Sequence, residues 1–218
     1  MLRISNIVFV FMVALNQIGG EVPQKILLTV YYESKCPDSK NFIEEQLQPT
    51  INQFHNYLIL KLVPFGKARS INNGYKYTGF ECQHGPTECA GNMVQSCALD
   101  LMQERNDVEK VSYVACEMET EAGTRGDMKC VRKAGLHPGA VHNCVSSGKG
   151  VSLQLNDEYN TNLVRPQFIP TITINGEFNQ EVQDIGFRDL PAILCTILKD
   201  TPPCAEHYNS RAMLYVLL

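Results

Sequence analysis

The chain has 218 residues and a formal net charge of −4 at pH 7. Its basic residues are scattered along the chain, so the sequence offers no electrostatic surface for nucleic acid, and we expect no nucleic-acid partner. Nine cysteines indicate an oxidising compartment, because disulfides persist there and are rare elsewhere.

Residues 1–20 have the plan of a secretory signal peptide. One basic residue, Arg3, precedes an apolar run over residues 7–15, which is too short to cross a bilayer, since a span needs about 20 apolar residues. The mature chain is therefore expected to begin near Glu21. No second apolar run reaches spanning length, so we predict no membrane span and either secretion or delivery to the lysosome.

The opening third of the mature chain, residues 21–66, predicts a β-α-β unit. Two short runs that are apolar throughout and rich in β-branched residues are typical of buried strands. The expected elements are a strand over residues 25–32, a helix from Asp38 or Ser39 to about Tyr57 with a kink at Pro49, and a strand over residues 57–64. This order favours parallel pairing of the two strands through a right-handed crossover.

Residues 67–160 differ in composition and predict an insertion. Six of the nine cysteines lie in this segment, and the apolar density falls. Apolar residues at helical spacing predict a helix over residues 88–106 and a weaker one over residues 108–119. We interpret the segment as a helical, disulfide-rich region that core packing alone does not hold together.

Residues 161–204 again show the strand and helix patterns seen in residues 21–66. An apolar strand around residues 168–174 ends at Asn175-Gly176, the strongest short signal for a two-residue hairpin turn, so a second strand is expected to follow. Residues 187–198 predict the last helix, and residues 205–218 form a tail. The order β-α-β, insertion, β-β-α predicts an α/β protein with a thioredoxin-like fold and a disulfide-rich, partly helical insertion.

Cys36 lies where the first strand is expected to pass into a helix. Unpaired N–H groups and the positive end of the helix dipole at that position favour a thiolate, which is the nucleophile in disulfide exchange. We therefore predict a reactive, solvent-reachable thiol at Cys36, with a structural half-cystine or a buried, inert cysteine as the alternatives. Ser39 stands three positions later, where its hydroxyl can donate a hydrogen bond to the thiolate but cannot displace sulfur from sulfur.

The other eight cysteines are candidates for disulfides. Eight cysteines allow 105 pairings, and only a local bridge between Cys195 and Cys204 is singled out here. The candidates are Cys82, Cys89, Cys97, Cys116, Cys130, Cys144, Cys195 and Cys204. No metal site is expected, because paired C-x-x-C knuckles are missing. The odd cysteine leaves a disulfide-linked dimer open as an alternative.

Three cysteines and a histidine occur at fixed spacing in one stretch of sixteen residues. The positions that define the pattern C-Q-H-G-x-x-E-C-x-x-N-x-x-x-x-C are Cys82, Gln83, His84, Gly85, Glu88, Cys89, Asn92 and Cys97. The pattern resembles the signature of the gamma-interferon-inducible lysosomal thiol reductase (GILT) family. We interpret its residues as scaffold: His84 in a local hydrogen bond, Glu88 and Asn92 at a helix entry, and cysteines that fasten the insertion to the core.

The resemblance implies a thioredoxin-like enzyme that reduces protein disulfides with a C-x-x-C pair. It also implies a cis bond between Ile169 and Pro170, next to the reactive cysteine, where an extended substrate would bind. The chain departs from the family pattern at Ser39. No bound cofactor is expected, and glutathione or another small thiol would act as co-reductant on disulfide-containing protein substrates.

The missing second cysteine leaves two functions open. In the first, Cys36 is the only nucleophile of a thiol–disulfide exchange enzyme, and an external thiol resolves its mixed disulfide. In the second, the chain is a catalytically impaired binding protein that captures partners through the groove beside Cys36 and Pro170. The chain has no Asn-x-Ser/Thr sequon, so the sequence offers no site for a glycan tag that would direct it to lysosomes, and secretion is favoured.

Overall fold

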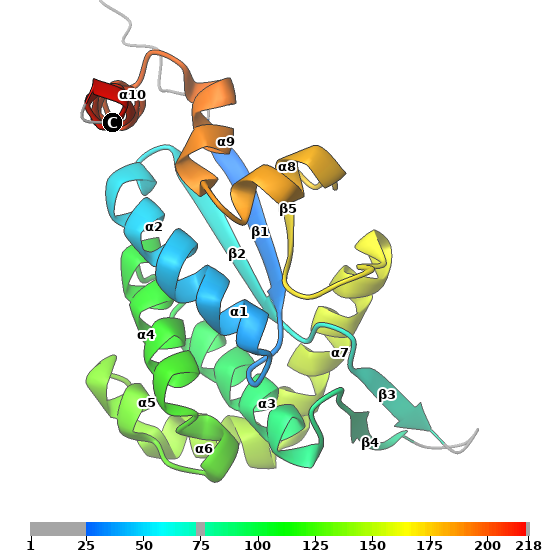
Figure 1. Cartoon of the computed structure of the whole chain (residues 1–218). Coiled ribbons are helices and arrows are strands. Elements are labelled where there is room, and N and C mark those ends of the chain that lie inside the picture. Colours follow the sequence, from blue (N-terminus) through cyan, green and yellow to red (C-terminus); the bar gives the residue numbers. More distant parts are fainter. Residues whose placement is uncertain (1–24, 73–76, 217–218) are drawn as a thin grey trace, which may run out of the picture.

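A computed structural model describes residues 25–72 and 77–216 of the chain (Figure 1). The predicted signal peptide and the last two residues of the tail lie outside the described residues. The described part combines a small central sheet with ten α-helices.

A three-stranded sheet with the order β2-β1-β5 forms the centre of the fold. β1 (Ile26–Tyr32) pairs in parallel with β2 (Leu58–Pro64) and antiparallel with β5 (Thr171–Ile174). The two strands predicted near the N-terminus are thus present within a residue or two of their expected bounds. β1 is buried along nearly its whole length, as expected for a central strand that is apolar throughout.

The helix between β1 and β2 begins earlier than predicted. It runs through three segments: α1 (Pro37–Asn41), the π-helical turn η1 (Phe42–Leu47) and α2 (Gln48–Phe54). The predicted start at Asp38 or Ser39 was wrong, because Cys36 is the N-cap and Pro37 takes the first helical position, where its missing N–H costs nothing. The wider π turn ends two residues before Pro49, whose ring would collide with the carbonyl four residues before it in a regular α-helix.

The segment after β2 contains a β-hairpin and most of the helices. Its elements are β3 (Arg69–Asn72), β4 (Tyr77–Glu81), α3 (Pro86–Leu101), α4 (Asp107–Thr120), a 3₁₀ turn η2 (Gly123–Arg125), α5 (Lys129–Lys133), α6 (Pro138–Ser146) and α7 (Gly148–Val164). The helix predicted to end at Asn106 ends at Leu101 instead. Asn106 caps α4, where its side chain accepts a hydrogen bond from Glu109 N at 2.9 Å. The hairpin, η2, α5, α6 and α7 were not predicted.

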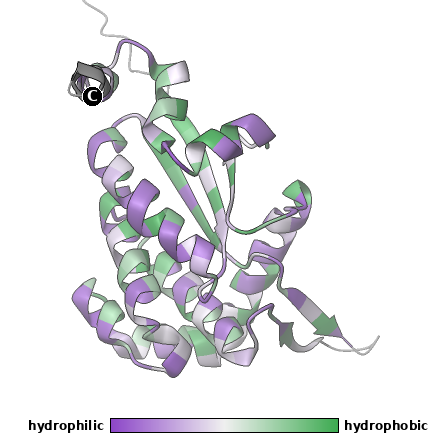
Figure 2. Cartoon of the chain, viewed as in Figure 1, coloured by the Kyte–Doolittle hydropathy of each residue, from purple (hydrophilic) through white to green (hydrophobic). Residues whose placement is uncertain are grey.

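The insertion shares one hydrophobic core with the sheet, contrary to the expectation that core packing does not hold it. Val94 of α3 and Val111 of α4 belong to the same buried cluster as Leu28 of β1 and Ile51 of α2. Figure 2 shows hydrophobic strands between helices of mixed character, which is typical of helices with one face on a common core. Figure 1 shows the insertion helices gathered at the end of the sheet where α1 begins.

The C-terminal part differs from the predicted β-β-α unit. Asn175 and Gly176 form the expected turn with positive φ values of 52° and 83°, but only an isolated bridge between Ile174 and Glu177 follows, and the second strand is absent from the described residues. The predicted helix over residues 187–198 is α9, which begins at Leu190. The remaining elements are α8 (Gln180–Gly186), α9 (Leu190–Leu198) and α10 (Pro202–Val216). None of the helices described here has the length and apolarity needed to cross a bilayer.

Candidate active site

Cys36 is the N-cap of α1, at the end of the loop that leaves β1. It is the free cysteine of the described residues, and the structure pairs the other eight. Its Sγ lies 3.6 Å from the carbonyl oxygen of Ile169, and the bond between Ile169 and Pro170 is cis, as the resemblance implied. The nucleophile expected from the sequence and the substrate-binding pair expected from the resemblance therefore meet in space across 133 residues.

Cys36 is more buried than expected. The residue is 7 % exposed, whereas the sequence predicted a solvent-reachable thiol. The reason is the loop that carries the cis proline: Ile169 is 8 % exposed and its carbonyl oxygen faces the sulfur.

Ser39 is fully buried in the first turn of α1. Its Oγ accepts a hydrogen bond from Glu33 N at 3.4 Å. The hydrogen bond from Ser39 to the Cys36 sulfur that the sequence suggested is not among the contacts of the described residues. Ser39 instead ties the start of the helix to the loop that precedes Cys36.

The signature stretch holds the loop before Cys36 in place. Asn92 Oδ1 accepts a hydrogen bond from Ser34 N at 2.9 Å, and Ser34 Oγ donates to the carbonyl oxygen of Glu88 at 3.0 Å. Glu88 lies in the first turn of α3, as predicted, but Asn92 lies in the second turn and is fully buried. Asn92 is therefore not a helix-entry residue; it satisfies a buried N–H group of the loop.

Of two other signature residues, Gly85 has a local conformational role, and the contacts reveal no role for Gln83. Gly85 is the N-cap of α3 with φ 86° and ψ −175°, a conformation that glycine adopts readily and residues with a Cβ rarely do. Gln83 is exposed.

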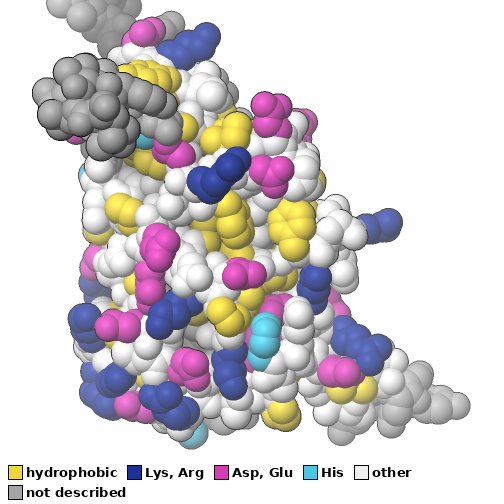
Figure 3. Space-filling model, viewed as in Figure 1, with side chains coloured by type: hydrophobic (Ala, Val, Ile, Leu, Met, Phe, Trp, Pro, Cys, Tyr) yellow, Lys and Arg dark blue, Asp and Glu magenta, His cyan; other side chains and the backbone are white. Residues whose placement is uncertain are grey.

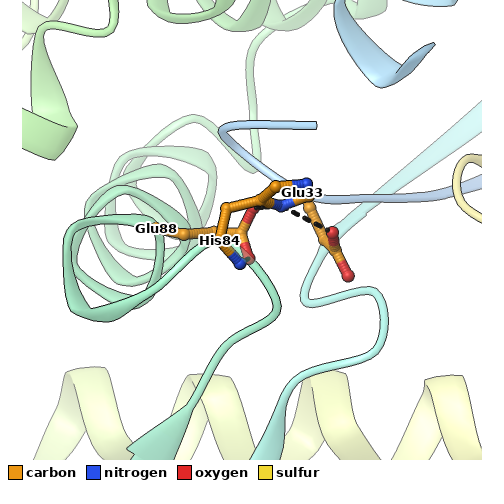
Figure 4. A group of neighbouring side chains, drawn as sticks. All are labelled: Glu33, His84 and Glu88. Atoms are coloured by element: carbon orange, nitrogen blue, oxygen red, sulfur yellow. Dashed lines mark hydrogen bonds and ion pairs between the residues drawn. The ribbon is translucent and has the colours of Figure 1, made fainter. Parts of the chain in front are cut away.

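His84 lies between two buried carboxylates (Figure 4). Its Nδ1 is 2.6 Å from Glu88 Oε2 and 3.3 Å from Glu33 Oε2, while the backbone N of His84 donates to Glu88 Oε1 at 3.0 Å. Burial is the main cause that raises the pKa of Glu33, and it outweighs the hydrogen bond from Lys67 N. Sequence reasoning gave Glu33 no role; its only signal was a carboxylate at the end of a buried strand, three residues before the reactive cysteine.

The eight remaining cysteines form four disulfides. The pairs are Cys82–Cys89, Cys97–Cys144, Cys116–Cys130 and Cys195–Cys204. The local bridge suggested near the C-terminus is one of them, and it joins α9 to α10. The first three pairs lie within the insertion, so the expectation that the signature cysteines fasten the insertion to the core was wrong. Packing and hydrogen bonds make that connection instead.

Comparison with solved structures defines the class of protein. A putative protein disulfide isomerase from Nitrosomonas europaea superposes with a TM-score of 0.54, over 81% of this chain and 98% of that chain, at 11% identity. The oxidoreductase DsbA from Xylella fastidiosa gives a TM-score of 0.52, over 83% of this chain and 89% of that chain, at 14% identity. The chain therefore has the thioredoxin/DsbA-like fold that its sequence predicted.

Comparison of sequences identifies the family. The profile of the family "Gamma interferon inducible lysosomal thiol reductase (GILT)" matches residues 27–134. The gamma-interferon-inducible lysosomal thiol reductase of Carassius auratus is 31% identical over 88% of this chain and 77% of its own length, and GILT-like protein 1 of Drosophila melanogaster is 32% identical over 84% and 80%. The chain belongs to the GILT family. Thiol–disulfide exchange is the chemistry that this family and fold support.

Proposed function

We propose that the protein is a thiol–disulfide exchange enzyme in which Cys36 is the only nucleophile and an external thiol such as glutathione completes the cycle. The observation that carries the proposal is the placement of one unpaired cysteine at a helix N-terminus against the Ile169–Pro170 loop, while eight others are bonded. A helix start is in general a position where unpaired N–H groups favour the thiolate, which is the form of cysteine that attacks a disulfide.

The proposed cycle balances with two small thiols. The Cys36 thiolate attacks one sulfur of the substrate, so that a mixed disulfide forms and the other substrate sulfur leaves as a thiol. Glutathione thiolate attacks the Cys36 sulfur and releases the second substrate thiol. A second glutathione then regenerates the Cys36 thiolate and leaves as oxidised glutathione. The substrate disulfide is reduced, and two glutathione molecules are oxidised.

Ser39 explains why the resolving thiol comes from outside. In a C-x-x-C site this position attacks the mixed disulfide, but a hydroxyl does not exchange with sulfur. The buried Ser39 Oγ is also engaged with Glu33 N. We expect the mixed disulfide at Cys36 to last longer than it would in a two-cysteine relative.

The substrate would bind as an extended segment across the Ile169–Pro170 loop. Hydrophobic side chains gather on this face between α1, α8 and β5 (Figure 3). Phe178 is 41 % exposed beside Phe168, with 6.0 Å between their ring centroids. Disulfide-containing proteins that expose apolar segments, such as partly unfolded ones, fit such a surface.

The place of action is proposed as the lysosome or the extracellular space. The relatives from Carassius auratus and Mus musculus are named lysosomal, and the mouse protein is 25% identical over 81% of this chain and 69% of its own length. The candidate signal peptide supports entry into the secretory route in either case.

The test is reduction of insulin by the purified protein in glutathione. Cys36→Ser should abolish activity above the glutathione background, and Ser39→Cys should raise turnover because it restores an internal resolving thiol. Ser39→Ala is the matched control, since it also removes the hydroxyl but adds no thiol. Unchanged activity in Cys36→Ser would refute the proposal. A lasting adduct of Cys36 with insulin that glutathione does not release would instead favour a capture protein.

A further inference from the structure

We propose that Glu33, His84 and Glu88 form a binding site for a divalent metal ion of the Zn²⁺ type. The site lies outside the thiol chemistry described above and uses none of the cysteines. The sequence predicted no metal site, because paired C-x-x-C knuckles are missing, whereas these ligands are carboxylates and an imidazole from two distant segments.

The ligand atoms converge from three elements. Glu33 follows β1, His84 lies in the turn between β4 and α3, and Glu88 lies in the first turn of α3. One ligand atom of each lies within 4.8 Å of the others, and Figure 4 shows the three side chains turned toward one another. Carboxylate oxygen and imidazole nitrogen are ordinary zinc ligands.

One carboxylate oxygen points into this space without a hydrogen bond. Glu33 Oε2 is buried and has no hydrogen-bond partner; it makes an ion-pair contact with His84 Nδ1 at 3.3 Å. A buried carboxylate oxygen in that state is costly, because it has lost water and gained no donor. A cation between the two carboxylates and the imidazole would satisfy it.

The charge of the cluster also favours a cation. Both glutamate side chains are 0% exposed, and among the described ion pairs no lysine or arginine contacts either carboxylate. In their ionised form, two buried carboxylates facing one imidazole would carry negative charge that a divalent ion would balance. Protons that the three side chains share are the competing source of positive charge, and the test below separates the two.

The surroundings fix the ligands in the manner of a metal site. The second oxygen of each carboxylate is held by a backbone N–H: Glu33 Oε1 accepts from Lys67 N at 2.7 Å, and Glu88 Oε1 accepts from His84 N at 3.0 Å. Such outer hydrogen bonds orient ligating oxygens. The His84 side chain is 32% exposed, which gives an ion a path of entry and leaves room for water as a fourth ligand.

A metal here would join the loop that leads to Cys36 to the start of α3. Glu33 is three residues from Cys36, and the Cys36 N–H donates to the Glu33 carbonyl oxygen at 3.3 Å. The ion would therefore add a structural bond beside the thiol without contacting it.

The first test measures Zn²⁺ binding by isothermal titration calorimetry at pH 7.5. The parent protein carries Cys36→Ser, so that a zinc–thiolate bond does not contribute. We expect one Zn²⁺ per chain, and an affinity at least about tenfold lower after His84→Ala or Glu33→Gln. His142→Ala is the matched control, because His142 is an exposed histidine of α6, and it should leave the affinity unchanged. Circular dichroism checks that each variant is folded.

The second test needs no substitution in the site. Zinc-edge X-ray absorption of the same Cys36→Ser parent protein with one equivalent of Zn²⁺ should show nitrogen and oxygen ligands at about 2.0–2.2 Å and no sulfur at about 2.3 Å. Absence of stoichiometric binding, a sulfur ligand, or equal affinity in folded His84→Ala and the parent would overturn the proposal.

Discussion

At the scale of single residues, Gly91 determines how closely α3 approaches the loop before Cys36. A Cβ at this position would lie 2.5 Å from Ser34 Oγ, 3.0 Å from Ser34 Cβ and 2.6 Å from Thr124 Cγ2. A change from glycine to alanine inside a helix normally stabilises the helix by about 1 kcal/mol. Here we expect the crowding to outweigh that gain and to lower the free energy of unfolding by about 1–3 kcal/mol, measured by urea denaturation.

Gly148→Ala is the control for this prediction. Gly148 is also the position of a helical glycine, at the start of α7, but a Cβ there meets nothing within 4 Å. The free energy of unfolding of the Gly148→Ala variant should be unchanged or slightly higher than that of the wild-type protein. Because Ser34 lies in the same loop as Cys36, Gly91→Ala should also slow insulin reduction, whereas Gly148→Ala should not. Equal stability of the two variants would contradict this account of the α3 contact.

Some residues of the candidate site could be predicted from the sequence, and others could not. Cys36 could be predicted as the free cysteine because nine cysteines leave at least one unpaired, and because Cys36 lies where a predicted strand is followed by a helix. The role of Asn92 was not predictable, since it depends on the buried Ser34 N–H, 58 residues away. The burial of Cys36 depends in the same way on the carbonyl oxygen of Ile169, which only the folded chain brings to the sulfur.

At the scale of elements, the disulfides differ in the length of chain that they close. Cys97–Cys144 joins α3 to α6 across 47 residues, and Cys82–Cys89 closes only 7. Loop-closure entropy predicts losses of about 4 and about 2 kcal/mol when each pair is replaced by alanines. Guanidinium unfolding of the two double variants would measure the difference. The reverse order would show that local packing, and not chain entropy, decides the contribution of these bridges.

Apolar pattern explains which elements the sequence revealed. β1 and β2 were predictable because both are largely apolar, although only β1 is buried along nearly its whole length; β2 exposes Ile59 and Lys61, contrary to the prediction of a second buried strand. α7 was missed because its buried residues, Gly150, Gln154 and Thr161, are small or polar and produce no hydrophobic period. After the Asn175–Gly176 turn the chain reads Glu-Phe-Asn-Gln-Glu, which offers no alternating apolar face, so the turn forms without a second strand.

At the scale of the whole molecule, one core joins the sheet to the insertion, and it encloses carboxyl groups. Glu117 of α4 is 1 % exposed, and its Oε2 accepts a hydrogen bond from Gly123 N at 2.7 Å. Asp157 of α7 is partly buried and accepts a hydrogen bond from Ser96 Oγ of α3 at 2.6 Å. Burial is the main cause that raises the pKa of both carboxyls, because it penalises the charged form.

The pKa of Asp157, raised from 3.8 to about 7, predicts how stability depends on pH. Between about pH 4 and pH 7 the folded chain keeps this proton while the unfolded chain has lost it, so stability falls as the pH rises. The fall is complete above the folded pKa and amounts to at most about 4 kcal/mol, less in practice because the carboxyl is partly exposed. Asp157→Asn keeps the shape and removes the charge, so the wild-type protein should lose more stability than the variant between pH 4.5 and pH 8 in urea unfolding. Parallel curves for the two proteins would show that Asp157 is already ionised in the folded state at the lower pH.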